Sequence, residues 1–225
     1  MPAISLLLGG ATNAGHNGAD RLGSRNARPG ADHYPLTTIL LRSLPGCAVA
    51  DCYTHILTML YYISGGQRSG KSRYAQELAL QLSPNPVYLA TSRPWDDDHR
   101  QRIARHVADR DDRWTTLEEE KYLSRLDLTG RTVVLDCVTL WLTNFFADAK
   151  YAVEATLQQA QAEFDQLIRQ DCTLLVISNE IGMGLHAPTE AGRKFADLQG
   201  WLNQHIAQRA DRAIFMVSGL PLVVK

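Results

Sequence analysis

The chain has few cysteines, no excess of charge of either sign and no long apolar run. Four cysteines in 225 residues are too few for a disulfide framework. Two of them, Cys137 and Cys172, lie in apolar segments, where buried free thiols are usual. The formal net charge of −1 argues against the broad basic surface by which many proteins bind nucleic acid.

Membrane-spanning and secreted classes are disfavoured on similar grounds. No apolar run reaches the roughly 20 residues that a spanning helix needs. The short apolar patch from Ile4 to Leu8 has no basic residue before it, unlike a secretory signal. We therefore expect a cytoplasmic protein without a membrane span and without a nucleic-acid partner.

Residues 1–58 differ in composition from the remainder of the chain. Glycine, alanine, asparagine, aspartate, arginine and proline dominate between Gly9 and Pro35, and no helical or strand periodicity is sustained there. Such a segment buries too little apolar surface to offset the entropy lost on ordering. We expect residues 1–58 to be a poorly structured leader, dispensable or due to a mis-assigned start, and residues 59–225 to form the folded domain.

From Met59 onward, short apolar segments alternate with segments of helical character. The expected strands are Leu60–Ile63, Val87–Ala90, Thr132–Asp136, Thr173–Ser178 and Ala213–Val217. The expected helices are Ser72–Leu82, Asp97–Ala108, Thr139–Phe146, Ala152–Arg169 and Glu190–Ala210. In the first helix, Tyr74, Leu78 and Leu82 recur every four residues and predict its apolar face. The alternation predicts an α/β fold, a mostly parallel sheet with helices on both faces.

The strongest motif follows the first expected strand. Eight consecutive residues fit G-x-x-x-x-G-K-[ST] in full: Gly65, Gly66, Gln67, Arg68, Ser69, Gly70, Lys71 and Ser72. Glycines let the backbone approach phosphate closely, and successive N–H groups with the following helix N-terminus bind the anion. Lys71 is expected to neutralise the β- and γ-phosphates, and the Ser72 hydroxyl to help hold Mg²⁺. The sequence therefore predicts a P-loop that binds a nucleoside triphosphate.

Two positions compete as the acidic partner of that metal ion. Asp136 ends one expected strand and Glu180 follows another, so both belong at the carboxyl edge where α/β sheets bind ligands. Either carboxylate could hold Mg²⁺ through water, and either could instead cap the next helix. We take Asp136 as the first choice and Glu180 as the alternative.

One histidine lies in a basic helical segment. Arg102, His106 and Arg110 are spaced at i, i+4 and i+8, which places them on one helix face. Neighbouring positive charge disfavours the imidazolium form, and a neutral imidazole is nucleophilic. From the spacing alone, a solvated face paired with nearby aspartates is the favoured interpretation.

Several shorter motifs accompany the P-loop in a fixed order. They are Tyr88–Ser92, then Arg102, Ile103 and His106, then Trp114 and Glu118–Glu119, and later Leu135–Cys137, Asn179–Gly184 and Val217–Pro221. A P-loop alone is shared by many NTPases, but the ordered set is much more specific. Over residues 59–225 it resembles the bifunctional adenosylcobinamide kinase and adenosylcobinamide-phosphate guanylyltransferase family.

The resemblance implies a RecA-like P-loop domain that assembles as a homotrimer and catalyses two reactions. The first transfers the γ-phosphoryl group of ATP or GTP to the aminopropanol hydroxyl of adenosylcobinamide. The second attaches GMP from GTP to the new phosphate, with loss of pyrophosphate, to give adenosylcobinamide-GDP. A histidine carries GMP covalently in this family, and His106 matches that position. The resemblance thus reverses the interpretation drawn from spacing alone.

The resemblance also carries a set of nucleotide-binding positions onto this chain. Besides the P-loop they are Thr91, Ser92, Arg93, Val107, Ala108, Asp109, Arg110, Glu118 and Asp136. Nothing in composition or periodicity indicates a corrinoid pocket, so the corrinoid substrate rests on the resemblance. A P-loop kinase of another small alcohol and a non-catalytic NTP-binding switch stay open as alternatives.

The division at Met59 is directly testable. A chain that begins at Met59 is expected to retain the folding and the turnover of the full chain, because residues 1–58 carry no recognisable chemistry. Circular dichroism and kinase assays on the two chains check this. Loss of folding or turnover in the shorter chain would contradict it.

Overall fold

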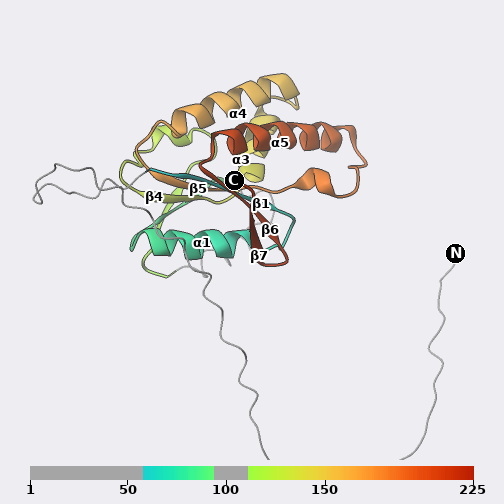
Figure 1. Cartoon of the computed structure of the whole chain (residues 1–225). Coiled ribbons are helices and arrows are strands. Elements are labelled where there is room, and N and C mark those ends of the chain that lie inside the picture. Colours follow the sequence, from blue (N-terminus) through green and yellow to red (C-terminus); the bar gives the residue numbers. More distant parts are fainter. Residues whose placement is uncertain (1–57, 94–110) are drawn as a thin grey trace, which may run out of the picture. The chain divides into compact units, whose positions relative to one another are not determined.

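The computed structural model describes residues 58–93 and 111–225 (Figure 1). Its strands are β1 (Leu60–Gly65), β2 (Val87–Ala90), β3 (Thr115–Glu118), β4 (Thr132–Leu135), β5 (Thr173–Ile177), β6 (Arg212–Val217) and β7 (Leu220–Val223). Its helices are α1 (Lys71–Leu82), α3 (Val138–Asp148), α4 (Val153–Leu167) and α5 (Glu190–Arg209), with short 3₁₀ turns η1 (Leu123–Arg125) and η2 (Ile181–Met183).

The seven strands form one sheet in the order β3-β2-β4-β5-β1-β6-β7. Neighbouring strands from β3 to β6 are parallel, and only β7 runs antiparallel, paired with β6. The strand β1, which leads into the P-loop, therefore lies between β5 and β6. One strand, β5, separates it from β4.

Helices cover both faces of this sheet (Figure 1). On one face, Ala75 and Ala79 of α1 pack with Val134 and Leu175 of the central strands. On the other face α3, α4 and α5 build a larger apolar cluster. The strands β4 and β5 are buried along their whole length, which explains why their sequences are apolar without polar alternation. The predicted α/β fold class is confirmed.

Most elements agree with the sequence prediction to within two residues. All five expected strands are present, and four of the five expected helices lie within the described residues. The fifth, Asp97–Ala108, lies outside them. The prediction missed β3 and β7. Their side chains are largely exposed, so neither strand carries the apolar run by which a buried strand is recognised.

The predicted apolar face of α1 was partly wrong. Ala75 and Ala79 are fully buried, whereas Leu82 is 40% exposed at the end of the helix. Tyr74 and Leu78 pack beside the two alanines, only partly buried. Because α1 packs directly on β4 and β5, small side chains occupy the centre of the contact and larger ones its margins.

Two further expectations concern thiols and membrane spans. Cys137 and Cys172 are both free thiols; Cys172 is buried and Cys137 half-buried. Burial raises the pKa of each thiol, which favours the unreactive protonated form. Among the described residues, the helices are too short or too polar to cross a bilayer.

Candidate active site at the carboxyl edge of the sheet

The P-loop connects the end of β1 directly to the start of α1. Its backbone enters the left-handed region at Arg68, with φ of 59°, and at Gly70, with φ of 97°. At Gly65 a β-carbon would lie 2.7 Å from the carbonyl oxygen of Met216, closer than real contacts allow. The glycines at both ends of the loop are therefore required by the fold itself.

Lys71 lies buried at the base of this loop, with 7% of its surface exposed. Its ammonium Nζ donates hydrogen bonds to the carbonyl oxygens of Gly65, at 3.1 Å, and Gly66, at 2.6 Å. Burial lowers the pKa of Lys71, and interactions with Cys137 and Glu180 oppose that shift. A partly desolvated ammonium at the loop interacts strongly with an anion, because little water screens the pair. This is the charge that the motif predicted for binding phosphates.

The β6–β7 hairpin braces the loop from outside. Ser218 and Gly219 both have positive φ, 50° and 85°, as in the tight two-residue turns that suit twisted hairpins. The amide of Gly219 donates to the carbonyl oxygen of Ser69 at 2.9 Å. A β-carbon at Gly70 would lie 3.2 Å from the Cα of Gly219. The sequence prediction missed this contact, although Ser-Gly after an apolar strand is a turn signal.

The parallel strands bring most of the predicted site residues to one edge of the sheet. Thr91 and Ser92 follow β2, Glu118 ends β3, and Asp136 follows β4, while the P-loop follows β1. The register pairs Ala90 with Glu118, so these strand ends are level with each other. They share the carboxyl edge, where α/β sheets bind ligands. The sheet order nevertheless separates β3 from β1 by three strands.

Thr91 is fixed by buried hydrogen bonds behind that edge. Its hydroxyl donates to the carbonyl oxygen of Cys137 at 3.2 Å. The Asn144 side chain is fully buried and donates to the carbonyl oxygens of Thr91, at 2.7 Å, and Glu120, at 2.9 Å. One amide thus ties the segments after β2 and β3 to helix α3. Asn144 carried no recognisable signal in the sequence.

Arg93 takes part in an ion-pair network rather than pointing only to solvent. Its guanidinium donates to both carboxylate oxygens of Asp148, at 2.8 and 3.1 Å, and also to Glu120. Lys121 contacts the same Asp148 carboxylate at 3.0 Å. These bonds raise the pKa of Arg93 and hold the pKa of Asp148 well below its usual range. The network fixes the start of the segment that follows β2.

Glu180 lies at the P-loop itself. Its backbone amide donates to the carbonyl oxygen of Gly65 at 3.2 Å. Its carboxylate oxygen Oε1 accepts hydrogen bonds from the Tyr62 hydroxyl, at 3.2 Å, and from the Asn203 amide, at 3.3 Å. The next residue back, Asn179, donates to the Thr139 hydroxyl at 3.1 Å. Neither Tyr62 nor Asn203 was singled out from the sequence.

The oxygen groups near the loop suit a magnesium ion that keeps much of its water. Mg²⁺ prefers oxygen ligands and in nucleotide sites uses few protein groups, since phosphates and water complete its shell. Ser72, which is half-buried in the first turn of α1, and Asp136, at the end of β4, offer such oxygens. Among the described residues no group of three histidine, cysteine or acidic side chains could hold a metal by itself. The donors present thus fit a nucleotide-bound Mg²⁺ and not an all-protein metal centre.

Part of the predicted site lies outside the described residues. This applies to the expected nucleophile His106 and to the four positions that follow it, Val107, Ala108, Asp109 and Arg110. Their assignment rests on the sequence.

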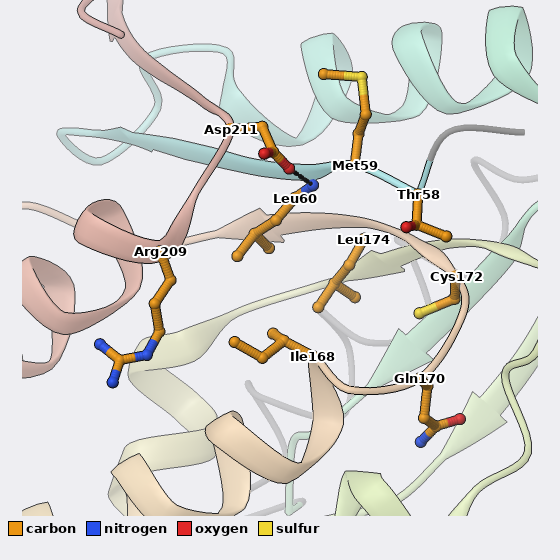
Figure 2. A pocket seen from close by; sticks show the side chains of 9 residues that line it. All are labelled: Thr58, Met59, Leu60, Ile168, Gln170, Cys172, Leu174, Arg209 and Asp211. Atoms are coloured by element: carbon orange, nitrogen blue, oxygen red, sulfur yellow. Dashed lines mark hydrogen bonds between the residues drawn. The ribbon is translucent and has the colours of Figure 1, made fainter.

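A small cavity lies at the opposite edge of the sheet (Figure 2). It has a volume of about 160 Å³ and is lined by Leu60 and Leu174, which lie at the starts of β1 and β5, and by Asp211, among others. The Asp211 carboxylate accepts a hydrogen bond from the backbone amide of Leu60 at 2.7 Å. Because these residues stand at the amino ends of the strands, the cavity is separate from the P-loop edge.

The fold and the loop together define a P-loop nucleotide-binding α/β protein. The family model described as cobinamide kinase / cobinamide phosphate guanyltransferase matches residues 61–224. The chain belongs to this family.

Curated relatives agree with that assignment. The bifunctional adenosylcobalamin biosynthesis protein CobP of Pseudomonas aeruginosa is 38% identical over 168 residues, which cover 72% of this chain and 95% of the relative. The protein CobU of Escherichia coli K12, with the same description, is 34% identical over 182 residues, covering 74% of this chain and all of the relative. Among solved structures, an ATPase domain aligns with 70% of this chain and 68% of its own at 10% identity. Its TM-score of 0.37 is too low to carry an argument.

The glycine geometry of the loop gives a matched pair of substitutions. Gly65→Ala is expected to lower the free energy of unfolding by about 1–3 kcal/mol, because its β-carbon collides with the Met216 carbonyl and φ is unfavourable. Gly200→Ala in α5 has open space around it and is expected to stabilise by roughly 0.5–1 kcal/mol through helix propensity. Urea unfolding measures both values. Equal effects of the two substitutions would contradict the strain assigned to the loop.

Proposed function

We propose that this chain phosphorylates adenosylcobinamide with ATP or GTP and then transfers GMP from GTP to the phosphorylated product. The observation that carries the proposal is a complete P-loop with a buried Lys71, in a chain whose family is described as cobinamide kinase and cobinamide phosphate guanyltransferase. The curated relatives are described as bifunctional proteins of adenosylcobalamin biosynthesis. The corrinoid substrate follows from these relationships.

In the kinase step the protein mainly positions groups and stabilises charge. The P-loop amides and Lys71 bind the β- and γ-phosphates. Ser72 and Asp136 are the residues that we assign to Mg²⁺, which supplies charge neutralisation at the phosphates when bound. The acceptor is the aminopropanol hydroxyl of the corrinoid. Thr91, Ser92, Arg93 and Glu118, at the same edge of the sheet, are proposed nucleotide contacts.

In the transferase step we assign the nucleophile to His106. Its imidazole attacks the α-phosphorus of GTP, the bond to the β-phosphate oxygen breaks, and pyrophosphate leaves. The corrinoid phosphate then displaces the histidine and takes over GMP. Dividing one transfer into two displacements is ordinary covalent catalysis. The nearby positions Val107–Arg110 are the proposed contacts of the guanine nucleotide.

Labelling with GTP tests the covalent step. Wild-type protein incubated with Mg²⁺ and α-labelled GTP, then denatured, is expected to retain label that is labile in acid and stable in alkali, as a phosphoramidate is. His106→Ala is expected to retain no label. Lys71→Ala is expected to reduce labelling about 10²-fold or more, because it removes charge stabilisation at the phosphates.

His205→Ala is the matched control, since that histidine pairs with Asp165 on the helical face of the sheet. It is expected to label like wild type. Full labelling of His106→Ala would exclude that residue as the nucleophile. A folded, GTP-binding wild type that takes up no label would favour a plain P-loop kinase.

We further propose that residues 59–225 form the catalytic unit. The family match begins at residue 61, β1 begins at Leu60, and about three quarters of this chain covers nearly the full length of the relatives.

The same unit is proposed to assemble as a homotrimer. The exposed apolar side chains of β7, Leu220, Leu222 and Val223, support an association of this kind, because monomers rarely expose a contiguous apolar edge strand. Light scattering is expected to give three times the chain mass of 25.0 kDa. A mass equal to one chain at micromolar concentration would contradict the trimer.

A further inference from the structure

Glu180 has a closer link to the P-loop than the other acidic residues of the described edge. It follows β5, the immediate neighbour of β1, and its backbone amide bonds to the carbonyl oxygen of Gly65, the first P-loop residue. Lys71, which holds two carbonyls of the same loop, interacts electrostatically with Glu180. Asp136 follows β4, one strand further from the loop. A carboxylate at the position of Glu180 therefore faces the phosphate end of a bound nucleotide.

Two donors aim the Glu180 carboxylate. The Tyr62 hydroxyl and the Asn203 amide both donate to the same oxygen, Oε1. Among the described residues, none donates a hydrogen bond to the second oxygen, Oε2. A carboxylate that is fixed through one oxygen keeps the other available as a proton acceptor.

A buried polar network in turn fixes Asn203. Ser178 and Gln199 donate to Asn203 Oδ1 at 2.6 and 2.8 Å, and Asn203 also donates to the carbonyl oxygen of Asn179 at 3.1 Å. Ser178, Gln199 and Asn203 are each no more than 5% exposed. Buried polar groups are costly unless they are hydrogen-bonded, and a connected network holds its members in one arrangement. Helix α5 thus helps to set the orientation of an acid at the opposite end of its network.

From this geometry we propose that Glu180 is the catalytic base of the phosphoryl-transfer step, with Tyr62 and Asn203 as positioning residues. The inference rests on the proposed kinase function. The acceptor hydroxyl gives its proton to Glu180 Oε2 while its oxygen bonds to the γ-phosphorus. The bond from the γ-phosphorus to the β–γ bridging oxygen breaks, and its electron pair leaves with the nucleoside diphosphate. Glu180 then releases the proton to solvent.

The decisive variant is Glu180→Gln, which keeps size and shape but cannot accept the proton. The kcat for phosphorylation of adenosylcobinamide is expected to fall about 10²-fold or more, as for loss of a general base, with KM for the nucleotide within about threefold of wild type. GMP labelling from GTP is expected to persist. Glu154→Gln, an exposed glutamate on α4, is the matched control and is expected to behave as wild type.

The dependence of the rate on Mg²⁺ separates a base from a metal ligand. If Glu180 acts as a base, raising the Mg²⁺ concentration leaves the rate of Glu180→Gln low. Recovery of the rate at high Mg²⁺ would overturn the assignment, because it would identify Glu180 as part of the metal site. A kcat within about threefold of wild type, in a protein with unchanged melting temperature, would overturn it as well.

Tyr62→Phe tests the positioning role. Removing the hydroxyl is expected to lower kcat about threefold to tenfold without changing KM or the melting temperature. Adding Tyr62→Phe to Glu180→Gln is expected to cause no further loss, since residues that act through one group are not additive. Independent, multiplying losses would contradict the coupling of Tyr62 to Glu180.

The wild type distinguishes failure of this inference from failure of the proposed function. If wild-type protein does not phosphorylate adenosylcobinamide, the proposed substrate is wrong. The role of Glu180 is then measured on the slow hydrolysis of the γ-phosphate, in which water replaces the alcohol. Glu180→Gln is expected to reduce that hydrolysis by the same order, and an unchanged hydrolysis rate would overturn the base assignment.

Discussion

The parallel pairing of the strands is the constraint on which the site depends. Six neighbouring strands run in one direction, so every connection that leaves a carboxyl end emerges at the same edge. Residues that are far apart in sequence, from Gly65 to Glu180, are brought to that edge without any contact between distant loops being needed. The apolar strands β4 and β5 hold this arrangement in place because both of their faces are buried. Loss of the pairing would separate the P-loop from its acidic residues.

Local strain and desolvation at the P-loop depend on the same frame. The left-handed backbone at Arg68 and Gly70 is held by β1, by α1 and by the Gly219 amide of the β6–β7 hairpin. Burial of Lys71 disfavours its charge, which makes a phosphate anion a strongly favoured partner. The loop is thus prepared for phosphate before a nucleotide arrives, and preorganised charge of this kind is usually the largest catalytic contribution.

The sequence predicted those parts of the molecule that depend on local pattern. The P-loop, the five inner strands and four helices follow from glycine spacing and apolar periodicity, and the placement of Asp136 at the end of β4 agrees with the expected edge. Strands β3 and β7 were missed because their pattern is exposed, and the centre of α1 was misjudged because packing on the sheet selects alanine over leucine. The partners of Glu180 were not predictable. Tyr62 lies in β1 and Asn203 in α5, and only the fold brings both side chains to one carboxylate oxygen.

The central claim is that one P-loop protein carries out two successive transfers on a corrinoid. The most direct measurement is mass spectrometry of the corrinoid after incubation of the purified full chain with adenosylcobinamide, Mg²⁺ and ATP, followed by addition of GTP. The account predicts adenosylcobinamide phosphate in the first stage and adenosylcobinamide-GDP in the second. Recovery of unmodified adenosylcobinamide from both stages, with a folded protein that binds nucleotide, would contradict it.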